Sequence, residues 1–151
     1  DYWWTTLKSM QNFLKVNNIE NIDFLYNNSY EFENKIIAGT RGWNLNIEEP
    51  NDEKIQIREE MRLELSIKNG IENFQDDENS KEIIVCMHYP PISKENRYNV
   101  FTKILQKYNV KKCIYGHLHG KAHENAVEGM VDGIEYIMAS CDYTGFKLIK
   151  I

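Results

Sequence analysis

The sequence predicts an α/β fold, because a buried strand, an amphipathic helix and a second strand follow one another in its second half. Residues 83–87 form a continuous apolar run, which is typical of a central strand covered on both faces. Residues 100–108 place apolar side chains on one helical face, and residues 112–115 form a second short strand pattern. Strands joined in this way are parallel, with a right-handed crossover. We therefore expect a βαβ unit over residues 83–116.

The composition indicates one ordinary globular domain over residues 1–151. A net charge of −5 argues against a broad surface for nucleic acid or for an anionic membrane. No apolar run approaches the ~20 residues of a membrane-spanning helix. The three cysteines lie in or beside apolar runs, which favours buried free thiols over metal ligands. Free thiols are typical of a reducing compartment, so we expect a cytoplasmic protein.

The first third of the chain predicts one helix and three short strands. Residues 4–16 carry apolar side chains at helical spacing. Strand patterns at 22–26 and 30–33 are separated by Asn27-Asn28-Ser29, a triplet that favours a hairpin turn. A further strand is expected at 35–38.

The Gly39-Thr40-Arg41-Gly42-Trp43 loop comes after the last of these strands. It could present the Arg41 guanidinium to an anionic substrate, which makes Arg41 a candidate substrate-binding residue. The commoner role for such an arginine is a structural ion pair with a carboxylate.

Residues 54–68 fit both an alternating strand and a wide helical face. Their Glu, Arg, Met and Leu content favours a helix, and Asn69-Gly70 is expected to end it. Toward the C-terminus, Asp132-Gly133 predicts a hairpin between residues 128–131 and 134–139. Residues 146–151 resemble a last strand.

Three of the four histidines come directly after predicted parallel strands. His88 ends the 83–87 run, and His117 and His119 come after the 112–115 run. Parallel strands end at the same edge of a sheet, where ligands bind in open α/β folds. Residues two apart on an extended backbone also point to the same side, so His117 and His119 can face one ligand. We therefore predict that these three imidazoles are metal ligands.

Three imidazoles can hold one Zn²⁺ with an open water position, whereas a two-metal site needs carboxylates as well. The chain offers no carboxylate cluster with ligand spacing. Asp142 could orient a metal-bound histidine, although a turn role is the commoner one. His123 could contact substrate, although a surface position is commoner.

Two motifs are similar to those of the calcineurin-like metallophosphoesterases. They are Met87-His88-Tyr89-Pro90-Pro91 and Gly116-His117-Leu118-His119-Gly120. Residues 1–4 resemble the segment directly after the family's Gly-Asn-His-Asp/Glu box, and residues 39–43 resemble a loop of bacterial predicted phosphohydrolases. The resemblance implies two β-sheets sandwiched between helices, an αββα arrangement. It also implies phosphoester hydrolysis by metal-activated water at two divalent ions, such as Mn, Fe or Zn.

By this resemblance, His88 and His117 bind one metal and His119 binds the other. The family's remaining ligand boxes, and its general-acid histidine, would precede Asp1. The chain is therefore expected to be the C-terminal portion of such a domain, completed by a missing segment or a partner chain. The expected substrate is a small phosphoester or a phosphoprotein, either a monoester or a diester. The alternatives are a non-enzymatic, degenerate metal-binding domain and a three-histidine mononuclear hydrolase.

Overall fold

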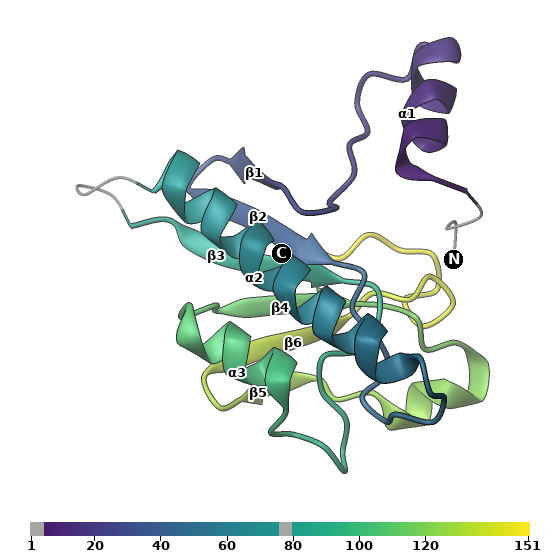
Figure 1. The fold of residues 1–151 in the computed structure, drawn as a ribbon, viewed down its shortest axis with the longest axis vertical. Coiled ribbons are helices and arrows are strands. Elements are labelled where there is room, and N and C mark those ends of the chain that lie inside the picture. Colours follow the sequence, from purple (N-terminus) through teal and green to yellow (C-terminus); the bar gives the residue numbers. More distant parts are fainter. Residues whose placement is uncertain (1–4, 76–79) are drawn as a thin grey trace.

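The fold is α/β, built on one mixed sheet of six strands with flanking helices (Figure 1). The computed structural model describes residues 5–75 and 80–151. Among these residues, no helix is both long enough and apolar enough to span a membrane. The elements in chain order are α1 (Leu7–Val16), β1 (Ser29–Phe32), β2 (Lys35–Thr40), α2 (Asp52–Phe74), β3 (Glu82–Met87), α3 (Val100–Lys107), β4 (Lys112–Tyr115), a short 3₁₀ helix η1 (Gly120–Asn125), β5 (Gly129–Val131) and β6 (Ile134–Met138).

The strand order is β1-β2-β3-β4-β6-β5, and the four central strands are parallel. The βαβ prediction is confirmed, because β3 and β4 pair in parallel and α3 connects them. The register aligns Thr40 with Met87, Met87 with Tyr115, and Tyr115 with Met138. All four parallel strands therefore end level with one another, and the loops after them leave from a single edge.

The core lies between the sheet and the helices α2 and α3, which cover the same face (Figure 1). The side chains that fill it from the helices include Leu63, Ile67, Phe101 and Leu105, all fully buried. The opposite face carries Ile37, Cys86, Ile114 and Ile137, which are only half-buried. The expectation that residues 83–87 are covered on both faces is therefore met fully on the helix-covered face alone.

Helix α2 continues through Asn69-Gly70, so the predicted helix end at these residues is wrong. A Cβ on Gly70 would lie 2.3 Å from Ile36 Cγ2, so the glycine lets the helix pack closely against β2. The Asn69 side chain accepts hydrogen bonds from Ser29 N–H and Oγ at 3.2 and 2.8 Å. The dipeptide thus serves packing between α2 and the first strands instead of ending the helix.

The predicted hairpin between residues 22–26 and 30–33 is also wrong. Residues 22–26 form no strand, and β1 instead pairs antiparallel with β2 across Glu33-Asn34. Glu33 adopts the left-handed φ of 52° that this tight turn requires. Because β2 is buried in the sheet and Asn69 holds the start of β1, tertiary contacts outweigh the local turn signal of residues 27–29.

The chain ends differ from the sequence prediction as well. Helix α1 begins at Leu7 with a Thr6 cap, and the motif at residues 1–4 lies outside the described residues. The hairpin at Asp132-Gly133 is confirmed, with both residues at positive φ. Residues 146–151 form no strand, because β4 and β5 already pair with the two edges of β6.

Candidate metal centre

The loops that leave the common edge are joined by main-chain hydrogen bonds. The N–H groups of His88 and Tyr89 donate to the Arg41 carbonyl at 3.1 and 2.8 Å. The Gly116 N–H in turn donates to the His88 carbonyl at 3.1 Å. The backbone around the predicted ligands is therefore fixed by the sheet and by contacts between its loops.

His88 and His117 lie in direct contact, as their strand-end positions predicted. His117 Nδ1 is 3.0 Å from His88 Nε2, and the two rings meet edge to face. The Tyr89 ring packs against His117 with centroids 4.0 Å apart. Two nitrogens bound tetrahedrally to one Zn²⁺ lie about 3.3 Å apart, given Zn–N bonds of about 2.0–2.1 Å. This imidazole pair, His88 with His117, thus has the spacing of two ligands to one ion.

The imidazole pair is electrically neutral at physiological pH. Burial, followed by the proximity of His117, lowers the pKa of His88 to about 4. Burial and the nearby His119 also lower the pKa of His117. A neutral imidazole has a free lone pair, which is the form that binds a metal.

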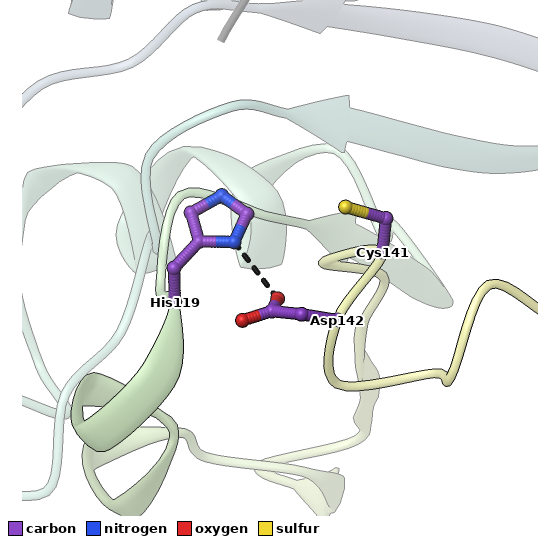
Figure 2. Close-up of side chains that lie close together, drawn as sticks. All are labelled: His119, Cys141 and Asp142. Atoms are coloured by element: carbon purple, nitrogen blue, oxygen red, sulfur yellow. Dashed lines mark hydrogen bonds and ion pairs between the residues drawn. The ribbon is translucent and has the colours of Figure 1, made fainter.

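His119 belongs to a second, exposed group (Figure 2). Its Nδ1 lies 2.8 Å from Asp142 Oδ1, and His123 Nε2 lies 3.2 Å from Asp142 Oδ2. The Gly120 N–H donates to Asp142 Oδ2 at 3.0 Å, and this bond, with the two histidines, holds the pKa of Asp142 well below its usual range. We call His119, His123 and Asp142 the aspartate group. A carboxylate that accepts from one imidazole nitrogen leaves the other nitrogen oriented for a metal.

Cys141 is a neighbour that the sequence did not predict. One ligand atom from each of His119, Cys141 and Asp142 lies within 4.8 Å of the others (Figure 2). Cys141 is exposed, whereas Cys113 is buried and Cys86 half-buried, so the expectation of three buried thiols is wrong for Cys141. The apolar run that buries Cys113 has no counterpart after Ser140, where the chain turns away from the sheet.

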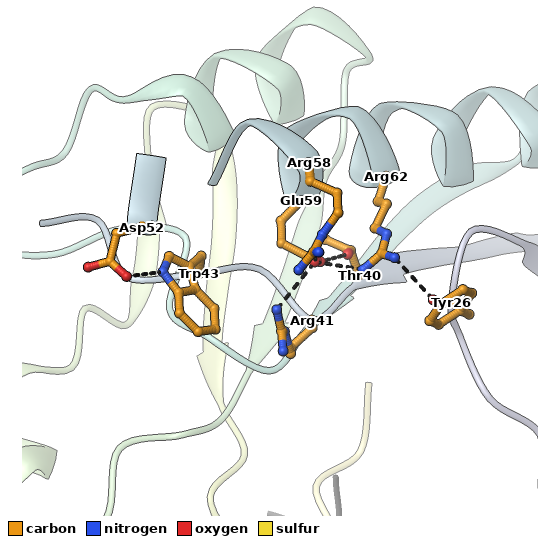
Figure 3. A network of polar contacts seen from close by, with 8 residues as sticks. All are labelled: Tyr26, Thr40, Arg41, Trp43, Asp52, Arg58, Glu59 and Arg62. Carbon is orange, nitrogen blue, oxygen red and sulfur yellow. Dashed lines mark hydrogen bonds and ion pairs between the residues drawn. The ribbon is translucent and has the colours of Figure 1, made fainter. Parts of the chain in front are cut away.

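Arg41 has both a structural partner and an open face (Figure 3). Its guanidinium lies 3.4 Å from the buried Glu59 and stacks over Trp43 at 4.6 Å. Trp43 is held in turn by Asp52, which accepts from its indole N–H at 3.0 Å. Arg41 also lines a cavity, so the pairing with a carboxylate does not remove it from the surface. Glu59 itself carried no signal in the sequence beyond a charge on a helix.

The donor set fits a divalent metal on its chemistry: a neutral imidazole pair, and an imidazole oriented by a carboxylate. The structure brings His88 to His117, and brings His119 and His123 to Asp142. A scan of protein-family models and searches of curated proteins and solved structures each returned no match to this chain. The resemblance to metallophosphoesterases therefore depends on the motifs and on this geometry.

Proposed function

We propose that the chain forms the histidine half of a metal-dependent phosphohydrolase site. The observation that carries the proposal is the neutral imidazole pair at the ends of two neighbouring parallel strands, with His119 on the next turn of the loop. These are the positions in which the family resemblance expects metal ligands. The substrate is a phosphomonoester or a phosphodiester.

In this proposal His88 and His117 hold one ion, and His119 holds the second. Two bound divalent ions supply an activated water and positive charge that stabilises the phosphoryl group in the transition state. Asp142 fixes the orientation of the His119 ring, and the Arg41 carbonyl fixes the loop that carries His88. The carboxylate ligands that complete such a site come from outside this set of residues.

The sandwich architecture is part of the same proposal. Helices cover one face of the sheet, while the other presents a half-buried apolar band across the parallel strands (Ile37, Cys86, Ile114 and Ile137). A second sheet packed on this band would bury it and give the two-sheet arrangement. The band thus supports the αββα prediction beyond the single sheet described above.

Metal binding by the chain is the first test. The chain is equilibrated with Zn²⁺ or Mn²⁺, dialysed, and its metal content and affinity are measured. We expect at least one ion per chain, and we expect His117→Ala to lower the affinity by about 100-fold, because it removes half of the imidazole pair. His123→Ala is the matched control, since it removes an imidazole outside the proposed ligand set. Equal metal binding by wild type and His117→Ala would contradict the proposal.

Hydrolysis is tested on the completed protein with p-nitrophenyl phosphate and bis-p-nitrophenyl phosphate. We expect metal-dependent release of nitrophenol that His119→Ala abolishes while the protein stays folded. A fully active His119→Ala protein would refute the proposal. The second candidate function is a non-catalytic metal-binding domain, which the exposed His119, Cys141 and Asp142 group favours. Metal binding without hydrolysis by the completed protein would select it.

A further inference from the structure

Three of the four arginines in the chain converge on one buried carboxylate (Figure 3). Arg41 comes directly after β2, whereas Arg58 and Arg62 lie on α2. Their guanidinium nitrogens lie 3.4, 3.5 and 2.8 Å from the same Glu59 oxygen. The remaining positive charges of the chain are almost all lysines. Arginine differs from lysine in offering a planar fork of donors, which suits carboxylates and phosphates.

The arginine cluster, Arg41, Arg58 and Arg62, holds more charge than Glu59 needs. Glu59 is fully buried and carries one negative charge, and its second oxygen already accepts from Thr40 at 2.7 Å. One arginine, Arg62, makes a short ion pair and also donates to the Tyr26 hydroxyl at 3.0 Å. A buried ion pair needs one such partner, so two positive charges remain in excess around this carboxylate.

The donors of the other two arginines are incompletely used. Arg41 and Arg58 make only the longer contacts to Glu59, at 3.4 and 3.5 Å. Arg41 Nε is shielded from solvent and has no hydrogen-bond partner among the described residues. A buried donor without a partner costs free energy of about 1–3 kcal/mol, so an acceptor at this place would stabilise the structure.

The cluster lines a cavity next to the imidazole pair. The cavity has a volume of about 310 Å³, and the hydroxyl groups of Thr5, Thr6 and Tyr26 line it beside the arginines. An adjoining cavity of about 420 Å³ includes His88 and shares Tyr26 and Thr40 with the first. A ligand that spans both would place one end near His88 and the other among the arginines.

We propose that the arginine cluster is an anion-binding subsite, which takes a second acidic group, a phosphate or carboxylate, of the molecule bound at the histidines. The anion-binding part stands on the cluster alone, while the assignment to substrate rests on the proposed phosphohydrolase function. The substrate class is then a phosphoester with an additional acidic group. The excess charge, the unused guanidinium donors and the hydroxyl-lined cavity are the features that such a group requires.

The binding test uses the full chain freed of metal with a chelator, which is then removed by dialysis, so that the histidines contribute no metal site. Inorganic phosphate and pyrophosphate are titrated at low salt by calorimetry. We expect saturable binding of one anion, with pyrophosphate the tighter. Arg58→Gln should weaken it at least fivefold, because it removes a half-exposed guanidinium with little loss of packing. Arg97→Gln, at the one arginine outside the cluster, is the matched control and should bind as wild type.

A variant with the opposite expected effect separates anion binding from simple neutralisation of Glu59. Glu59→Gln keeps the shape and removes the negative charge, so it should bind phosphate severalfold more tightly than wild type. Circular dichroism and a thermal melt establish that the variant is folded. If Glu59→Gln does not fold, Arg58→Gln against Arg97→Gln decides alone. Absence of saturable binding, or equal affinities in these two arginine variants, would overturn the subsite.

The source of the acidic group is tested on the completed enzyme. Arg58→Gln should raise the KM for 3-phosphoglycerate, which carries a carboxylate besides its phosphate, and leave the KM for p-nitrophenyl phosphate unchanged. Equal effects on both substrates would overturn the assignment to substrate. Because the calorimetry needs neither metal nor turnover, failure of the phosphohydrolase proposal leaves its outcome interpretable.

Discussion

The imidazole pair and the aspartate group lie on the same edge of the sheet but in opposite electrostatic environments. His88 and His117 are partly buried, face one another and are kept neutral by burial. His119 is exposed and lies against an ionised carboxylate, Asp142. One group is therefore prepared for a cation by the removal of its own charge, and the other by a negative charge placed beside it. The comparison shows that neighbouring ligands of similar chemistry can be tuned by different means.

The largest effect that separates the two groups is expected from Asp142→Asn. Loss of a carboxylate that orients a ligating histidine typically lowers metal affinity by about 10–100-fold. In the completed protein we expect this loss at the His119 ion alone, while the ion at the imidazole pair binds as before. A stepwise zinc titration against a chromophoric chelator resolves the two affinities. Tyr143→Phe, on the next residue, serves as the control, and equal losses at both ions would remove the distinction between the groups.

The two groups should also lose stability in different pH ranges. The folded pKa of His88, about 4, lies below its unfolded value of 6.5, so its contribution is complete above pH 6.5 and is lost as the pH falls toward 4. The lowered pKa of Asp142 instead gives stability that is present above pH 3.8 and is lost below it. Urea denaturation of the metal-free chain at several pH values measures both ranges.

Matched variants assign each range to its residue. His88→Asn should flatten the decline between pH 6.5 and 4, and Asp142→Asn should reduce the decline below pH 3.8. A wild-type free energy of unfolding that stays constant from pH 6.5 to 4 would show that His88 is not held neutral by burial.

The smallest effect concerns the thiol beside the aspartate group. Cys141 is exposed, whereas burial raises the pKa of Cys86 to about 11 and raises that of Cys113 further from reactivity. With Ellman's reagent at pH 8 we expect one fast thiol per folded chain, absent in Cys141→Ser and retained in Cys86→Ser. Saturating zinc should slow this thiol severalfold if the ion lies beside His119. Two or more fast thiols in the wild type would contradict the burial pattern.

The features that the sequence predicted correctly are those that depend on strand direction. Because β3 and β4 are linked through α3, their ends had to meet, and this alone brings His88 near His117. The periodicity of residues 100–108 was sufficient for α3, and the Asp132-Gly133 turn was sufficient for its hairpin. These are local signals that agree with the global fold.

The failures are places where a distant partner decides the local structure. Ser29 pairs with Asn69, forty residues away, and this contact moves the hairpin from residues 27–29 to Glu33-Asn34. Gly70 was interpreted as a helix end, although its role is to admit Ile36. For the candidate site, the sequence could not show that Arg41 shares Glu59 with Arg58 and Arg62, since charges on a helix carry no sign of where they converge.

Position 41 joins two tasks that mutation can separate. Its carbonyl accepts the N–H groups of His88 and Tyr89, and that service belongs to the main chain and survives exchange of the side chain. Its guanidinium alone reaches the cavity above Glu59. Relatives of this chain that carry another residue at position 41 are therefore expected to keep the histidine loop in place while differing in the acidic molecules they select. Selectivity can thus diverge at this edge without disturbing the ligand framework.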